Sequence, residues 1–182
     1  MIRVLLSTLL ACLVAAVATS PANAISGVSV SPGGAITLTS LARFIAQGTL
    51  GRLECNVSLR GTLTAGLIPI GAALARIGSI TGGTVTNCTL NGTPTAKTLN
   101  FSSPWDIAAN ANGLWVILRW SVMQSVCAYV GNVTLTPQLP SPVSLLITQV
   151  SPLVGSGICG TKTYLAGQGF LLSPAQTITL LP

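Results

Sequence analysis

The sequence has no histidine and almost no acidic side chains. Its 182 residues include only two acids, Glu54 and Asp106. Histidine is the commonest general base near neutral pH, so its absence excludes Ser-His-Asp and Cys-His catalytic arrangements. A glycosidase would have to place both acids across one scissile bond. We therefore expect no enzymatic activity.

The same scarcity argues against bound metals and cofactors. A typical calcium site needs several acidic oxygens, and a zinc site needs histidines or closely spaced cysteines. The chain has no Cys-x-x-Cys pair and no Gly-x-Gly-x-x-Gly phosphate loop between a strand and a helix. We expect no metal and no cofactor.

Charged residues of either sign are rare, at 5% of the chain against ~25% in typical soluble domains. Beyond residue 24, the basic residues stand alone at positions 43, 52, 60, 76, 97, 119 and 162. Nucleic-acid binding normally requires a clustered basic patch, so we expect none. The excess of positive charge favours only a weak attraction to anionic cell-surface polymers or membranes.

The first 24 residues have the pattern of a secretory signal peptide. Arg3 supplies the positive start, residues 4–17 are nearly all apolar, and Ala22-Asn23-Ala24 is a small-x-small cleavage signal. We predict cleavage before Ile25 and a single secreted domain over residues 25–182. No later segment is long and apolar enough to be a transmembrane helix. A competing interpretation is a lipoprotein signal, because Leu9-Leu10-Ala11-Cys12 resembles a lipobox.

Four cysteines remain after residue 24: Cys55, Cys88, Cys127 and Cys159. An even number in an exported chain predicts two disulfides, each closing a long loop. Three pairings are open from the sequence. We favour Cys55–Cys88 together with Cys127–Cys159.

The domain is rich in short segments that alternate between apolar and polar residues, as β-strands do. These segments are 35–39, 53–59, 84–86, 132–136, 144–150 and 177–181. Glycine- and proline-rich turn signals separate them, among them Gly33-Gly34, Asn91-Gly92 and Asn112-Gly113. Such a pattern predicts an all-β fold, either an antiparallel sandwich or a barrel.

Three segments qualify this pattern. Residues 80–85 suggest a tight hairpin with Gly82-Gly83 at its turn. Residues 41–45 and 67–77 show helical spacing, although an all-β setting favours strands or loops there. Residues 114–122, "LWVILRWSV", predict a central strand buried on both faces.

The tryptophans and the two acids are the remaining candidate contacts. Trp105 and Asp106 could form a surface or ligand contact; alternatively, Trp105 covers the core and Asp106 caps a turn or pairs with an arginine. Trp115 and Trp120 have opposite strand parity, which argues against a shared aromatic pocket. Glu54 should lie on the polar face of its strand near Arg52 or Arg60, opposite the buried face of Cys55.

A series of short motifs runs along the chain: Cys55 with Val57-x-Leu59-x-Gly61-Thr62, then Thr81-Gly82-Gly83-Thr84-Val85-x-x-Cys88, Pro104-Trp105, and Cys127-x-Tyr129-x-Gly131-Asn132. This order resembles small secreted all-β bacterial proteins of the actinobacterial type. It is more distantly similar to the alkane oxidation protein activator family. The resemblance implies an extracellular or envelope-associated, non-enzymatic protein, and it implies no functional residues.

We therefore expect a secreted structural or surface-interaction protein of the bacterial cell exterior. Its expected partners are cell-envelope components or further copies of itself, because low charge and high β-propensity favour association between strand edges. The alternative is a carrier or binding module for a hydrophobic small molecule held in an apolar cavity.

The signal-peptide and disulfide assignments predict the mass of the exported protein. Mass spectrometry of the secreted chain should give an N-terminus at Ile25 and no thiol that reacts with an alkylating agent before reduction. A lipid adduct on Cys12, or two alkylated cysteines in the unreduced protein, would contradict these assignments.

Overall fold

A computed structural model describes residues 24–48, 51–71, 73–99, 103–124, 127–140, 143–147, 151–155, 163–166 and 168–182. The described chain is all-β and contains no helix. The signal-peptide segment, apart from Ala24, lies outside the described residues.

The described residues form sixteen strands. They are β1 Gly27–Ser31, β2 Gly34–Ser40, β3 Phe44–Gly48, β4 Gly51–Leu63, β5 Gly66–Pro69, β6 Ala75–Leu90, β7 Thr93–Pro94, β8 Thr98–Leu99, β9 Trp105–Ala109, β10 Trp115–Gln124, β11 Cys127–Gln138, β12 Ser144–Leu146, β13 Ser151–Gly155, β14 Thr163–Ala166, β15 Gly169–Ser173 and β16 Thr177–Leu181.

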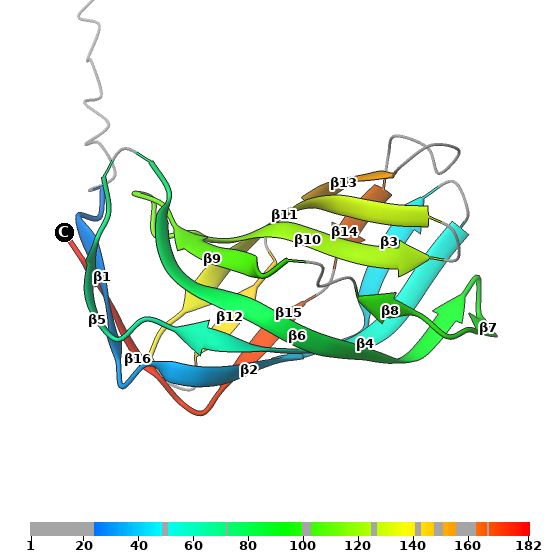
Figure 1. Cartoon of the computed structure of the whole chain (residues 1–182), viewed down its shortest axis with the longest axis horizontal. Helices are drawn as coiled ribbons and strands as arrows, with labels where there is room; N and C mark the ends of the chain where they lie inside the picture. The colour runs from blue at the N-terminus through cyan, green and yellow to red at the C-terminus, as the bar shows by residue number, and fades with distance from the viewer. Residues whose placement is uncertain are drawn as a thin grey trace, which may run out of the picture.

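Eight strands close into an antiparallel barrel, which decides between the two predicted architectures (Figure 1). The order around the barrel is β4, β6, β9, β10, β11, β12, β15 and β2, and β2 pairs again with β4. Successive barrel strands along the chain are therefore neighbours, as in up-and-down barrels. Strands β3, β14 and β13 pair in that order and connect β4 with β11. They extend the wall lengthwise, because β3 pairs with the first half of β4 and β2 with the second half.

A separate three-stranded sheet, in the order β16-β1-β5, stands across one end of the barrel (Figure 1). Val28 and Val30 of β1 are fully buried and belong to the hydrophobic core. The backbone N–H of Ile25 donates to the carbonyl of Ala111 in the β9–β10 turn at 2.8 Å. The folded domain thus includes the residue at which we expect the mature chain to begin.

The barrel interior is built by the alternation that the sequence predicts. Along β4, Leu53, Cys55, Val57 and Leu59 are buried, and the residues between them are outward-facing. The 35–39, 53–59, 84–86, 132–136 and 177–181 segments are all strands. The sixth, 144–150, is a strand only over Ser144–Leu146, and residues 148–150 lie outside the described part.

Four aromatic side chains pack together inside the barrel. The ring centroids of Phe44 and Phe170 are 4.7 Å apart, those of Trp105 and Trp120 are 5.0 Å apart, and those of Phe44 and Trp120 are 5.5 Å apart. Each of these side chains is almost fully buried. Aromatic packing at these separations adds to the stabilisation that burial alone provides.

The predicted 80–85 hairpin is wrong, because Gly82 and Gly83 lie inside the single long strand β6. Gly83 allows close approach between strands, since a Cβ atom there would meet the backbone oxygen of Ser58 at 2.7 Å. Residues 44–48, 66–69 and 75–77 are in strands, so the strand alternative to helical spacing is confirmed there.

The parity argument against Trp115 and Trp120 sharing the interior is also wrong. Ile117 pairs with Val133 and Trp120 with Gly131, so two residues of β10 face the single residue Asn132. This β-bulge resets the alternation, and both tryptophans are buried, at 0% and 1% exposure. The prediction that the 114–122 segment is buried on both faces holds over residues 115–117 but not at Arg119, which is exposed.

A second bulge lies between β4 and β6, where Arg60 pairs with Gly82 but Gly61 pairs with Ile80. A Cβ atom on Gly61 would overlap the backbone oxygen of Ser79, whereas one on Gly82 would meet nothing within 4 Å. The two glycines are adjacent in the wall but differ in the space around them.

We predict that Gly61→Ala lowers the free energy of unfolding by about 2 kcal/mol, because backbone must shift to admit the methyl group. Gly82→Ala is the matched control and should change it by less than about 0.5 kcal/mol. Urea unfolding of both variants measures the difference. Equal effects would contradict the close approach of β4 and β6 at Gly61.

Candidate functional site

Both carboxylates lie on the outside of the barrel, and each is held between two arginines. Glu54 forms salt bridges with Arg52 at 2.6 Å and with Arg43 at 3.3 Å. Asp106 forms salt bridges with Arg119 at 2.7 Å and with Arg76 at 3.0 Å. Each cluster therefore carries a net charge of +1, and the chain has no acid left to neutralise its other cations.

The first cluster spans β4 and β6 at a bulge. Glu54 pairs with Thr89 and Asn56 with Thr86, so Cys55 faces both Asn87 and Cys88. The Nη2 of Arg43 donates to the backbone carbonyls of Glu54 and Asn87 and to the Thr89 hydroxyl. Arg43 thus satisfies backbone oxygens at the point where the bulge interrupts the ladder.

On the inner side of the same bulge, Cys55 and Cys88 form a disulfide. The favoured Cys55–Cys88 pairing is therefore confirmed. The other half of that prediction, Cys127–Cys159, is not tested, because Cys159 lies outside the described residues. Cys55 shares the buried face with Leu53 and Val57, as the alternation predicts, so its sulfur is structural and not a reactive thiolate.

The second cluster also lies at bulges. Arg119 occupies the β10 bulge with a φ of 63°, and its Nη2 donates to the Pro104 carbonyl at 2.9 Å as well as to Asp106. Arg76 precedes the irregularity at which β6 shifts register against β9. The cluster therefore joins β6, β9 and β10.

The two candidate contact residues Trp105 and Asp106 lie on opposite sides of the barrel wall, Trp105 inside and Asp106 outside. Trp105 is 1% exposed and packs against Trp120. Asp106, the next residue on β9, points the other way and pairs with the two arginines. The alternative interpretation, a core tryptophan beside an ion-paired aspartate, is the arrangement found.

The two acids cannot act as a catalytic pair. Glu54 lies beside Thr89 and Asp106 beside Ser79, which are ten residues apart on β6. That separation is roughly 30 Å along the strand at about 3.3 Å per residue. Paired glycosidase carboxylates lie within about 5–9.5 Å of each other.

Two open depressions lie on the outer wall, one at each β4–β6 bulge. The first, of about 510 Å³, is lined by Arg43, Asn56, Asn87, Cys88, Thr89 and Pro94. The second, of about 330 Å³, includes Thr37, Arg60, Gly61, Thr81 and Pro174 in its lining. Their polar lining consists of hydroxyl, amide and guanidinium groups, which can hydrogen-bond to a ligand but supply no general base.

All the described charges fall on one half of the molecule. They lie on β4, β6, β9 and β10 or, for Arg43 and Lys97, in the segments beside β3 and β8. The described strands β1, β2, β5 and β11–β16 carry none. Arg60 and Lys97 are the described cations that no carboxylate contacts.

Nowhere in the described chain do three or more His, Cys, Asp or Glu side chains come together as metal ligands would. Within the same segments no helix could cross a membrane. No protein-family model matches this chain, and no curated protein or solved structure is significantly similar to it.

The sequence predicted that Glu54 lies on the outward face near Arg52 or Arg60. The outward position is confirmed, and of these two arginines Arg52 is the one that pairs with it. It missed Arg43 and Arg119 as partners of the acids. Arg43 lies between two strands, and Arg119 lies at a bulge, so neither contact follows from alternation along one strand. The depressions were missed for the same reason.

We predict that Arg43→Gln lowers the free energy of unfolding by about 2 kcal/mol, because it leaves the Glu54 and Asn87 carbonyls without their charged donor. Arg52→Gln is the matched control. It removes only an ion pair whose arginine side chain is 52% exposed and should cost less than about 1 kcal/mol. Thermal or urea unfolding of the oxidised proteins tests this order.

Added salt separates the two contributions further. In about 1 M NaCl the cost of Arg52→Gln should shrink, because exposed ion pairs are screened. The cost of Arg43→Gln should persist, since hydrogen bonds to backbone carbonyls do not require a net charge on the acceptor. If Arg43→Gln and Arg52→Gln lower the free energy of unfolding equally at both salt concentrations, the role assigned to Arg43 is contradicted.

Proposed function

We propose that the chain is a non-enzymatic protein of the bacterial cell exterior that acts through surface contact with cell-envelope components. The observation that carries this proposal is the use of both carboxylates in arginine clusters, which leaves the outer wall with unopposed positive charge. The predicted signal peptide and the Cys55–Cys88 disulfide support export to an oxidising compartment.

A catalytic role has little support from the same geometry. Both acids are ion-paired, they are far apart, and histidine is absent from the sequence. The outer wall instead presents hydrogen-bond donors, chiefly the N–H groups of arginine side chains. Glu54 and Asp106 occupy only some of these groups. Such a surface suits binding.

The carrier alternative rests on the architecture, because eight-stranded barrels enclose either packed side chains or one small ligand. Here Phe44, Trp105, Trp120 and Phe170 occupy the interior, which favours packing. One observation points toward a ligand: Trp115 and Trp120 have buried indole N–H groups without hydrogen-bond partners. We rank the carrier second because the packed rings outweigh these two donors.

The mature exported protein should co-sediment with envelopes isolated from the cells that produce it, and about 1 M NaCl should release it, because the contact depends on charge. The Arg60→Glu, Lys97→Glu double variant should stay in the supernatant under the same conditions. Both of its substitutions replace cations that no carboxylate contacts, so its fold should be retained, and circular dichroism checks this.

Wild-type protein that remains free of envelopes at low salt would overturn the surface-contact proposal. Extraction of one apolar molecule per chain from the purified protein would instead favour the carrier.

A further inference from the structure

From the two depressions and the charges beside them, we propose that the outer face of the β4–β6 pair is a binding track for an acidic polysaccharide. This inference rests on the proposed surface-contact function and names the class of partner. Both depressions reach the same strand. Asn56 lines the first depression and Arg60 the second, and both lie on the outward face of β4.

The two depressions follow one direction along the strand pair. Asn56 and Arg60 are four residues apart, which corresponds to about 13 Å at about 3.3 Å per residue. Each depression lies at a bulge of β4 against β6, so both open on the same wall of the barrel. A single extended chain lying along β4 could contact both, whereas a compact small molecule could not.

The lining chemistry fits sugars. Between and beside the depressions, the outward-facing residues of β4 and β6 include Asn56, Ser58, Thr62, Thr84 and Thr86. Amide and hydroxyl groups donate and accept hydrogen bonds, as sugar hydroxyls require. These side chains are spread along the strands and form no apolar surface.

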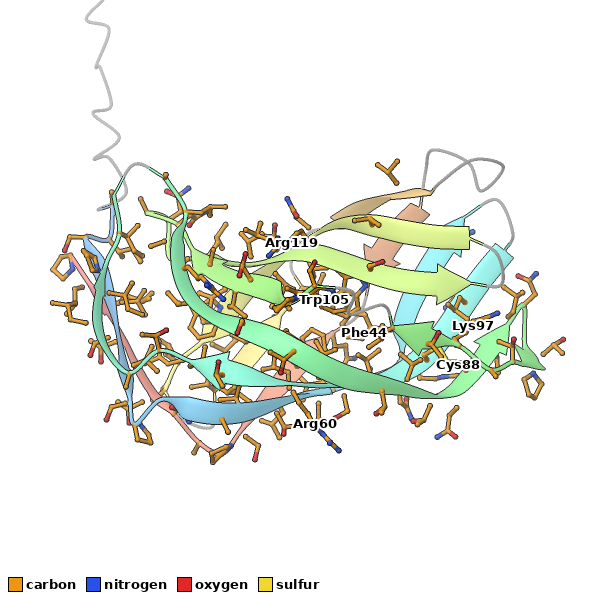
Figure 2. All side chains as sticks on the ribbon, in the orientation of Figure 1. Phe44, Arg60, Cys88, Lys97, Trp105 and Arg119 are labelled. Atoms are coloured by element: carbon orange, nitrogen blue, oxygen red, sulfur yellow. A yellow bond between two sulfur atoms is a disulfide. The ribbon has the colours of Figure 1, made fainter. Side chains whose placement is uncertain are left out.

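The positive charges on this face favour an acidic sugar polymer over a neutral one as the ligand. The Arg60 guanidinium has no carboxylate partner, and it projects outward from the barrel in Figure 2, away from the interior position of Phe44 and Trp105. A guanidinium of this kind can bind a carboxylate or sulfate through two parallel hydrogen bonds. Arg52, at the other end of β4, pairs with Glu54 through its Nε, and its side chain is still 52% exposed.

Two other polyanions fit this face less well. Single-stranded nucleic acids bind through exposed aromatic rings, and the three tryptophans are buried. Anionic membranes are bound by surfaces that also insert apolar side chains. The described residues of β4, β6, β9 and β10 include no exposed large hydrophobic side chain, since those found lie at Leu41, Leu67, Leu74, Val130, Leu139, Val154 and Leu171.

The test uses the mature exported protein and oligogalacturonate, an acidic oligosaccharide, with dextran as the neutral control. Calorimetry at low salt should detect binding to oligogalacturonate and none to dextran. Arg60→Gln should weaken binding about tenfold, the effect of losing one charge-assisted contact. Asn56→Ala should weaken it about threefold, because that contact is uncharged.

Lys97→Gln is the matched control. It removes the same charge as Arg60→Gln, but Lys97 lines neither depression, so it should weaken binding by less than about twofold. If Arg60→Gln and Lys97→Gln have equal effects, attraction is due to net charge alone and the track is overturned.

Binding to anionic vesicles or single-stranded DNA that is tighter than binding to oligogalacturonate would also overturn the proposal. The same holds if oligogalacturonate does not bind. In each of these cases, retained co-sedimentation with envelopes would leave the surface-contact function in place, and loss of co-sedimentation would remove both.

Discussion

The pairing of β4 with β6 is the interaction on which the rest of the barrel depends. These are its longest strands, and β4 also pairs with β2 and β3, so the barrel closes through it. Two bulges strengthen the local twist and bend that closure requires. The first is held from inside by the Cys55–Cys88 disulfide and from outside by Arg43. Because it links residues 33 positions apart, the disulfide can stabilise the fold by roughly 3–4 kcal/mol.

The scarcity of charge and the bulges are related features of this molecule. Isolated ion pairs on a surface contribute little to stability, and a chain with two acids can form few of them. Here both acids lie where strand pairing is irregular, and an arginine in each cluster also donates to a backbone carbonyl there. The arginines are therefore useful mainly as donors to groups that the β-ladder leaves unpaired.

The few charged residues are distributed unevenly over the barrel. Because each carboxylate is paired with two arginines, the charged half of the barrel carries a net positive charge, among hydroxyl and amide groups. The opposite half carries no described charge, and it includes the cross-strand pair Val130 and Val154, both exposed. The two halves differ in chemistry although they belong to one continuous wall. The charged half is the better candidate for binding, because complementary charge specifies what kind of partner it can meet.

The amino-acid sequence alone was enough to predict the all-β class, most strand positions and the buried face of β4, and to exclude histidine-based catalysis. These follow from local alternation and from composition, which do not depend on distant residues. Only the tertiary structure decided that the sheet closes into a barrel, that Trp115 and Trp120 share its interior, and that Arg43 and Arg119 meet the acids. A bulge shifts the alternation by one residue, and its position depends on the partner strand; a contact between strands depends on register. Neither is written in the local pattern, so the candidate site appears only when β4, β6, β9 and β10 are placed side by side.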